Sequence, residues 1–340
     1  NPLYSTWGYG VQPNIVTRES AAATGRRPSM GEIAARYGLV VIFLVLIVAL
    51  AIASPNFRDP ANLVNILMQN SIIGIVSCGM LLMIVLGGFD LSVGAVGATT
   101  SVIAAVVILQ TSSIPAGFLV ALLVGLAIGA LNGFVIAKIG INPFVTTLGT
   151  QVLFTGLLFA STNAQPVYGL PESVTLIGLG KIGIIPIATL IFAAVVTATF
   201  CVLRFTTLGH YIYAVGGNKE ACYLAGIDVD GVTIVTYALG GLAAAVAGLV
   251  LLGQTNIGQP ASATNWPLQA IGAVVVGGVP LTGGSGGVGR AVLGVFLLGT
   301  IANSLNQLGV SPYWQPAITG AVILIAVGLD AYQRKRKGGD

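Results

Sequence analysis

The sequence predicts an all-α, polytopic membrane protein. Charged residues make up 7% of the chain, whereas soluble domains contain about 25%. Hydrophobic residues make up 55%, and no charged residue occurs between Asp59 and Asp90 or from Gly231 to Gly289. A spanning helix needs about 20 mostly apolar residues to cross a core of about 30 Å, and the chain supplies many such segments. A β-barrel does not fit, because its strands would alternate polar and apolar residues.

Ten apolar segments are expected to form the membrane domain. Proline-containing turn signals separate several of them, for example Ile141-Asn142-Pro143. The eighth segment is short for a crossing and is expected to be broken or re-entrant, with its irregular backbone buried in protein or facing water. The segments are 38–54, 62–86, 91–110, 116–137, 143–162, 184–204, 231–253, 267–279, 291–308 and 315–332.

The distribution of Lys and Arg predicts the orientation. With ten spans both termini lie on one side, which collects all of the 14 basic residues except Arg58 and Lys181. Because basic loops stay in the cytoplasm, both termini and the loop 205–230 are predicted to be cytoplasmic. The expected organisation is a cytoplasmic tail with a juxtamembrane helix (1–37), a permease domain (38–333) and a basic cytoplasmic tail (334–340). The net charge of +4 follows from this topology and does not indicate nucleic-acid binding.

The loop 216–227 (GGNKEACYLAGI) lies between two long apolar runs and has the features of a short helix. Asn218 can cap its start, and Glu220 stands in the first turn, where the helix dipole favours a carboxylate. Gly226 can take the left-handed conformation that ends a helix. Such a piece is either an ordinary solvated loop or a docking surface that passes force from a soluble partner into the membrane, with Tyr223 and Leu224 as apolar contacts.

Asp90 is the single acidic residue close to a membrane core. It stands just before the third segment, where it is expected to cap the first turn of the helix. The alternative is a proton or cation site. The cap is favoured, because a proton relay would need a second ionisable group within the spans and none is found.

Several other patterns lead to no catalytic or metal site. The segment GSGGVG at 284–289 matches G-x-G-x-x-G, but no acidic residue follows at the required distance, so it is interpreted as a flexible cytoplasmic turn. The three Cys residues lack metal-like spacing and His210 is the single His, so neither a metal nor a cofactor is expected. Gly125, Gly129 and Gly133 share one helix face and indicate close helix packing, either within the chain or between subunits.

Neutral polar residues recur within the apolar segments. Amides and hydroxyls can hydrogen-bond a hydroxylated solute along a translocation path, but they can equally form pairs between helices. The candidate path residues are Asn65, Gln69, Asn70, Thr147, Gln151, Asn303 and Asn306.

The chain resembles the permease subunits of bacterial ATP-driven sugar importers, the ribose-type branch of a superfamily that includes branched-chain amino acid permeases. The resemblance covers about 38–333 and is carried by four blocks in order: GGFDLSVG at 87–94, the loop 216–227, GGVPLTGG at 277–284 and LGVSPYWQ at 308–315. It implies a second permease chain, an extracytoplasmic solute-binding protein and a cytoplasmic ATPase. The implied docking residues for the ATPase are Asn218, Lys219, Glu220, Ala221, Tyr223, Leu224 and Gly226.

The expected function is therefore the translocation path of an ATP-driven importer for a sugar or sugar-like polyol, in the bacterial inner membrane and in contact with membrane lipid. No catalytic residues are expected, since ATP hydrolysis belongs to a separate subunit. One alternative is a permease for branched-chain amino acids, although a zwitterion would favour charged partners or helix termini. Another is an ion-coupled carrier, which would normally use buried ionisable groups that the spans lack.

Overall fold

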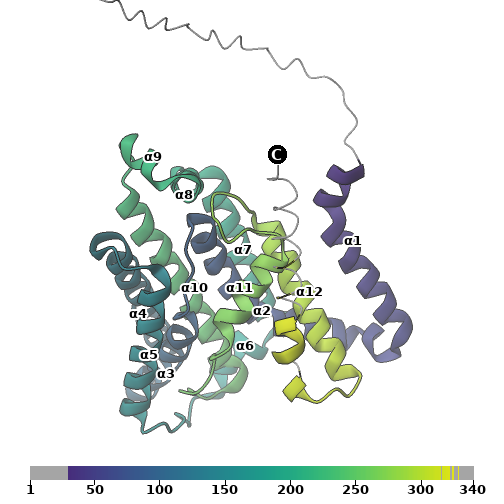
Figure 1. The fold of residues 1–340 in the computed structure, drawn as a ribbon. Helices are drawn as coiled ribbons and strands as arrows, with labels where there is room; N and C mark the ends of the chain where they lie inside the picture. Colours follow the sequence, from purple (N-terminus) through teal and green to yellow (C-terminus); the bar gives the residue numbers. More distant parts are fainter. Residues whose placement is uncertain (1–29, 315, 322–323, 325–327, 329–340) are drawn as a thin grey trace, which may run out of the picture. The chain divides into compact units, whose positions relative to one another are not determined.

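The computed structural model describes residues 30–314, 316–321, 324 and 328. The chain divides into two compact units, 1–38 and 39–340, and the second contains the long apolar helices. Almost all of its regular structure is helical (Figure 1). The helices are α1 (Met30–Ala53), α2 (Pro60–Leu86), α3 (Val93–Thr111), α4 (Ile114–Phe134), α5 (Pro143–Thr162), α6 (Leu176–Leu179), α7 (Ile187–Phe205), α8 (Thr207–Gly217), α9 (Lys219–Leu224), α10 (Val229–Thr255), α11 (Trp266–Val276) and α12 (Val288–Gln307).

The predicted all-α polytopic fold is confirmed. Within the described residues, seven helices are long and apolar enough to cross a membrane, and the two shorter apolar helices are Gly38–Ala53 and Trp266–Val276. These nine helices match the first nine predicted segments, with ends that differ by a few residues. Most of the tenth segment, 315–332, lies outside the described residues, as do the tails 1–29 and 334–340. The juxtamembrane helix predicted within 1–37 starts at Met30 and continues into the first span as α1.

Helix α2 is the most deeply buried of the long helices. It packs against α7, α8, α10, α11 and α12, and nearly its whole second half is buried. Pro60 starts the helix and Asp59 caps it, with the side-chain oxygen accepting a hydrogen bond from the Ala61 N–H at 2.9 Å. Gly87, in the left-handed conformation, ends it.

Helices α4 and α10 are held together by small residues, as Figure 1 shows for their neighbouring ribbons. A Cβ added at Gly125 would lie 2.5 Å from the Ala245 Cβ, and one added at Gly133 would lie 2.6 Å from the Ile234 Cα. Gly129 likewise faces the Tyr237 backbone. The shared glycine face therefore serves packing within the chain, which was one of the two readings open from the sequence.

Helix α11 is short, as the eighth apolar segment predicted. It begins after the irregular segment 256–265, and its first residue, Trp266, is buried with its ring against Gly97 of α3. The backbone before it is also covered, since Gly94 of α3 lies against the Ala263 carbonyl. Irregular backbone next to an apolar helix is tolerated when protein buries it in this way.

One small element escaped the sequence interpretation. Strands β1 (Lys181–Ile182) and β2 (Ile185–Pro186) form an antiparallel hairpin just before α7, with Lys181 opposite Pro186. Two-residue strands are too short to give an alternating pattern that could be recognised in the sequence.

Candidate functional site

The loop 216–227 contains the short helix that was predicted for it. Helix α8 ends at Gly217, Asn218 forms the turn, and α9 covers Lys219–Leu224. The Asn218 side-chain oxygen accepts a hydrogen bond from the Ala221 N–H at 2.9 Å, and Glu220 stands in the first turn. The predicted cap and helix start are therefore confirmed.

The end of α9 also follows the prediction. Gly226 has a φ of +78°, the conformation in which a side chain would be strained. The Ile227 N–H donates to the Cys222 carbonyl at 3.0 Å, and the Gly226 N–H donates to the Tyr223 carbonyl at 3.1 Å. These bonds satisfy carbonyls that a helix end otherwise leaves without partners.

Helix α9 presents apolar side chains to solvent. Tyr223 is 64% exposed and Leu224 is 86% exposed, whereas Cys222 of the same turn is buried. A short helix fixed on one side and apolar on the other is suited to receive a partner protein. Docking of an ATPase on α9 remains a prediction.

Helix α8 fixes α9 to the rest of the domain. The sequence interpretation missed it, although Thr206 provides a capping signal by accepting a hydrogen bond from the Gly209 N–H at 3.1 Å. Ile212 and Val215 of α8 are buried, and the helix packs against α2, α7 and α10. Figure 1 shows α8, α9 and the loop between α11 and α12 at the same end of the helices.

The glycine-rich loop 277–287 is held in place, although a flexible turn was expected at 284–289. The Gly284 N–H donates to the Val85 carbonyl at the end of α2, at 2.8 Å. The Tyr213 hydroxyl of α8 donates to the Gly286 carbonyl at 2.9 Å. Burial raises the pKa of Tyr213, so this hydroxyl stays protonated and able to donate at physiological pH.

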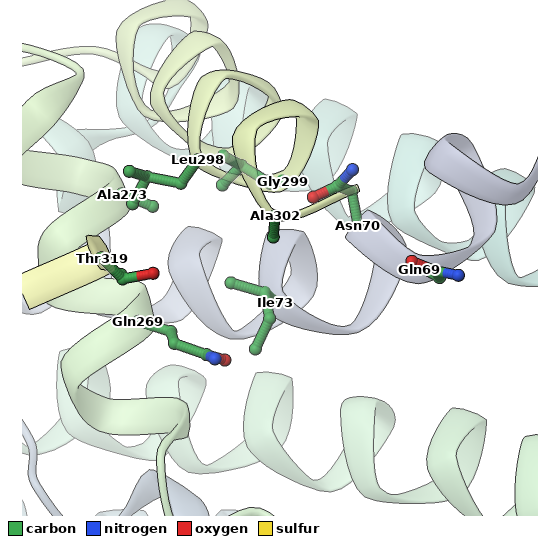
Figure 2. Close-up of a pocket in the computed structure, with 10 residues that line it drawn as sticks. Gln69, Asn70, Ile73, Gln269, Ala273, Leu298, Gly299, Ala302 and Thr319 are labelled. Carbon is green, nitrogen blue, oxygen red and sulfur yellow. The ribbon is translucent and has the colours of Figure 1, made fainter. Parts of the chain in front are cut away.

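A second candidate site is a cavity of about 240 Å³ between α2, α11 and α12. Figure 2 shows Asn70 beside Gly299 on one side and Gln269 and Thr319 on the other. None of the described residues that line it is charged, so it offers amide and hydroxyl groups in an otherwise apolar wall. The lining residues are Gln69, Asn70, Ile73, Gln269, Ala273, Val295, Leu298, Gly299, Ala302 and Thr319.

The seven predicted path residues do not form one surface. Gln69 and Asn70 line the cavity, and Asn65 is exposed on the same helix. Thr147 and Gln151 lie on α5, which packs against α3 and α4 away from the cavity. Thr147 instead accepts a hydrogen bond from the Leu91 N–H and donates to the Pro143 carbonyl.

The two α12 candidates do not line the cavity either. Asn303 pairs with Asn62 of α2, whose oxygen also accepts from the Gln307 amide at 2.9 Å. Asn306 is exposed. Asn303 therefore pairs with an amide of another helix, which was one of the two roles that the sequence left open for these residues.

Asp90 is not the N-cap of α3, which corrects the expectation from the sequence. The helix begins at Val93, and Leu91 and Ser92 form a turn before it. The carboxylate instead accepts hydrogen bonds from the Ser92 N–H and the Ser92 hydroxyl, each at 2.6 Å. The capping argument failed because it placed the start of the helix directly after Asp90.

The Asp90 carboxylate belongs to a buried cluster of neutral groups. The Asn132 amide nitrogen lies 3.4 Å from Asp90 Oδ2 and 2.9 Å from Ser92 Oγ, and the Thr150 hydroxyl donates to the Asn132 oxygen at 2.6 Å. Within the described residues the one ion pair joins Lys138 to Asp230, so no cation pairs with Asp90. The cluster ties the segment before α3 to α4 and α5.

Three polar residues with defined contacts in these candidate sites were missed from the sequence. Gln269 lines the cavity, Asn62 holds Asn303, and Asn132 joins Asp90. Asn132 could have been found, because it interrupts the apolar run of α4 beside the glycine face. Asn62 stands near a helix start, where an amide is easily mistaken for a turn residue. In the part of the chain that the structure describes, no group of three His, Cys, Asp or Glu could hold a metal ion.

Comparisons with known proteins agree on one kind of protein. A family profile described as "Branched-chain amino acid transport system / permease component" matches residues 62–327. The ribose import permease protein RbsC of Escherichia coli (strain K12) is 39% identical over 295 residues, which cover 86% of this chain and 92% of that protein. The L-arabinose transport system permease protein AraH of the same strain is 38% identical, covering 91% and 94%. RbsC of Bacillus subtilis (strain 168) is 36% identical, covering 84% and 89%. No solved structure matches the chain.

Proposed function

This chain belongs to the permease-component family of branched-chain amino acid transport systems, and from this premise we propose that it is the membrane permease of an ATP-driven sugar importer. It is a transport protein of the inner membrane with many spans, and it is not an enzyme. ATP hydrolysis is assigned to a separate ATPase chain. The observation that carries the proposal is α9, a capped helix anchored through α8 whose Tyr223 and Leu224 face solvent.

A sugar or sugar-like polyol is the proposed solute. The relatives at 36–39% identity are named for ribose and L-arabinose, and they cover most of this chain. The cavity between α2, α11 and α12 adds a chemical argument, because Gln69, Gln269 and Thr319 are neutral donors and acceptors suited to hydroxyl groups.

The alternative solute is a branched-chain amino acid, which the description of the family suggests. A zwitterion would be expected to meet opposite charges or helix termini in its path. Among the described residues, the cavity lining contains neither an acidic nor a basic side chain, and this favours the sugar. An ion-coupled carrier is disfavoured because Asp90, the buried carboxylate, is bonded to neutral groups and forms no ion pair in the part of the chain that the structure describes.

The proposed assembly contains two permease chains, a cytoplasmic ATPase and an extracytoplasmic solute-binding protein. The side that carries α8 and α9 is assigned to the cytoplasm, together with both termini, the tail 1–37 and the basic tail 334–340. The β1–β2 hairpin is assigned to the opposite side, where the binding protein would deliver its solute. The bias of Lys and Arg toward one side supports this orientation.

Competition for uptake tests the solute class. The permease would be reconstituted with its ATPase and binding protein, and ATP-dependent uptake of labelled ribose would be measured with an excess of unlabelled ribose, L-arabinose or leucine. The proposal expects the pentoses to compete and leucine to have no effect. Uptake of labelled leucine that neither pentose reduces would favour the amino-acid alternative.

A further inference from the structure

The last turn of α2 is bound to a loop that lies far away in the sequence. Helix ends leave carbonyl groups without partners inside the helix. The Val85 carbonyl is one of these, and the Gly284 N–H from the loop between α11 and α12 donates to it at 2.8 Å. The end of α2 and this loop are therefore joined by main-chain atoms.

Helix α8 reaches the same carbonyl. A Cβ added at Gly216 would collide with the Val85 oxygen, and it would lie 2.7 Å from the Gly284 nitrogen. Val85 and Gly284 are themselves hydrogen-bonded, so neither atom can move away without breaking that bond. The φ angle of Gly216 is not positive, so its backbone conformation would allow other residues. A glycine is needed there because a Cβ has no room.

Gly283 and Gly87 also belong to this contact, together with Gly216 and Gly284. A Cβ at Gly283 would lie 2.8 Å from the Gly87 Cα and 2.9 Å from the Gly216 oxygen. A Cβ at Gly284 would lie 2.8 Å from the Gly217 Cα. We call the contact formed by Val85, Gly87, Gly216, Gly283 and Gly284 the glycine junction. It brings three segments together with backbone on backbone.

The junction connects α9 to the cavity helices. Asn218 is the single residue between α8 and α9, so a displacement of α9 moves the Gly216 end of α8. Helix α2 runs from the junction to the cavity, where its residues Gln69 and Asn70 form part of the lining. The loop leads to α11 and α12, which carry Gln269 and Gly299. Main-chain contacts leave no flexible side chain that could absorb the movement.

We propose that the glycine junction transmits the movement of α9 to α2, α11 and α12, and that Gly216 is its key positioning residue. This inference rests on the proposed function, because it assumes an ATPase that moves α9.

Neighbouring glycines provide a matched test. Gly216→Ala inserts a methyl group into the junction, whereas a Cβ at Gly217 meets no atom within 4 Å. Both variants would be purified as the complete transporter with ATPase and binding protein, and ATP hydrolysis and solute uptake would be measured in the same vesicles. Gly216→Ala should lower the uptake per ATP hydrolysed by about tenfold while hydrolysis continues, because the added methyl separates α8 from α2. Gly217→Ala should keep the wild-type ratio.

A second variant keeps the test decisive if Gly216→Ala fails to assemble. Tyr213→Phe removes the hydrogen bond to the Gly286 carbonyl without adding volume. It should assemble normally and lower the uptake per ATP by about twofold to fivefold, the effect of one lost hydrogen bond. An unchanged ratio in Tyr213→Phe would then overturn the inference.

The failure of the inference can be told apart from failure of the proposed function. If wild-type uptake does not require the ATPase, the proposed function is wrong. If wild-type uptake is driven by ATP and an assembled Gly216→Ala transporter keeps the wild-type ratio, the junction does not transmit the movement and only this inference is lost.

Discussion

Asn62 and Asn303 exchange two hydrogen bonds between the ends of α2 and α12. The Asn62 nitrogen lies 3.2 Å from the Asn303 oxygen, and the Asn303 nitrogen lies 3.0 Å from the Asn62 oxygen. Both side chains are buried. Because the opposite end of α2 is fixed at the glycine junction, α2 is attached at one end to α12 and at the other to the loop that leads into α12. The cavity lies between these two attachments.

Replacing Asn303 should destabilise the permease. Asn303→Ala removes both hydrogen bonds to Asn62, at about 0.5–1.5 kcal/mol of folding free energy each, while Asn62 keeps its bonds to the Phe57 carbonyl and the Gln307 amide. Thermal unfolding of the purified protein in detergent measures the loss. Asn65→Ala is the control, because Asn65 is an exposed amide on the same helix and its removal should change little. Equal melting temperatures for Asn303→Ala and wild type would show that the pair does not hold α2 to α12.

The Asp90 cluster should require an acceptor oxygen and no negative charge. Asp90→Asn keeps an oxygen that can accept both bonds from Ser92, so most transport activity should remain. Asp90→Ala leaves the buried Ser92 N–H without a partner and should cost about 1–3 kcal/mol. Asp228→Ala, which removes an exposed cap of α10, is the control and should cost about 1 kcal/mol.

Uptake and thermal stability of the three variants decide the role of Asp90. If Asp90→Asn is as damaging as Asp90→Ala in a well-expressed protein, the carboxylate is needed for its charge, and a cation or proton role returns.

The exposed tip of α9 should determine binding of the ATPase. Leu224→Glu places a charge where an apolar contact is proposed, so the ATPase should no longer co-purify with the permease, while the permease itself stays folded. Leu176→Glu is the control, since Leu176 is 60% exposed on α6, near the β1–β2 hairpin. A Leu224→Glu permease that retains its ATPase at the wild-type ratio would remove α9 from the proposed interface.

Cysteine labelling from outside the cell should distinguish the two sides of the membrane. In a background without Cys78, Cys201 and Cys222, Ile184→Cys is expected to react with an impermeant maleimide in intact cells. Leu224→Cys is expected to react only after the membrane is opened. Ile184 is 80% exposed and Leu224 is 86% exposed, so accessibility within the protein is matched. The opposite labelling pattern would reverse the proposed orientation.

Features that depend on neighbouring residues could be predicted from the sequence. The apolar spans follow from runs of hydrophobic residues, and α9 follows from Asn218 and Gly226, whose capping chemistry acts over a few positions. The Asp90 cap was wrong by two residues because Leu91 and Ser92 form a turn before the helix starts. Local chemistry alone does not specify where a helix begins inside a packed domain.

Features that depend on residues far apart in the sequence could not be predicted. A glycine-rich turn at 284–289 looks flexible in the sequence, and only its contacts with Val85 and Tyr213 show that it is held. In the same way, a buried amide such as Asn303 can face a solute or another amide, and the sequence does not show its partner. The cavity is lined by residues of α2 and α11, which are far apart in the sequence. No local pattern around Gln269 could therefore identify it as a lining residue.

The energy source of uptake distinguishes an ATP-driven importer from an ion-coupled carrier. Vesicles would contain the permease with its ATPase on the inside, and the solute-loaded binding protein would be added outside with labelled sugar. Sugar should accumulate only when hydrolysable ATP is trapped inside, and the permease purified alone should hydrolyse no ATP; an importer of this kind depends on its ATPase. Accumulation driven by an imposed proton gradient in vesicles that lack the ATPase would contradict it.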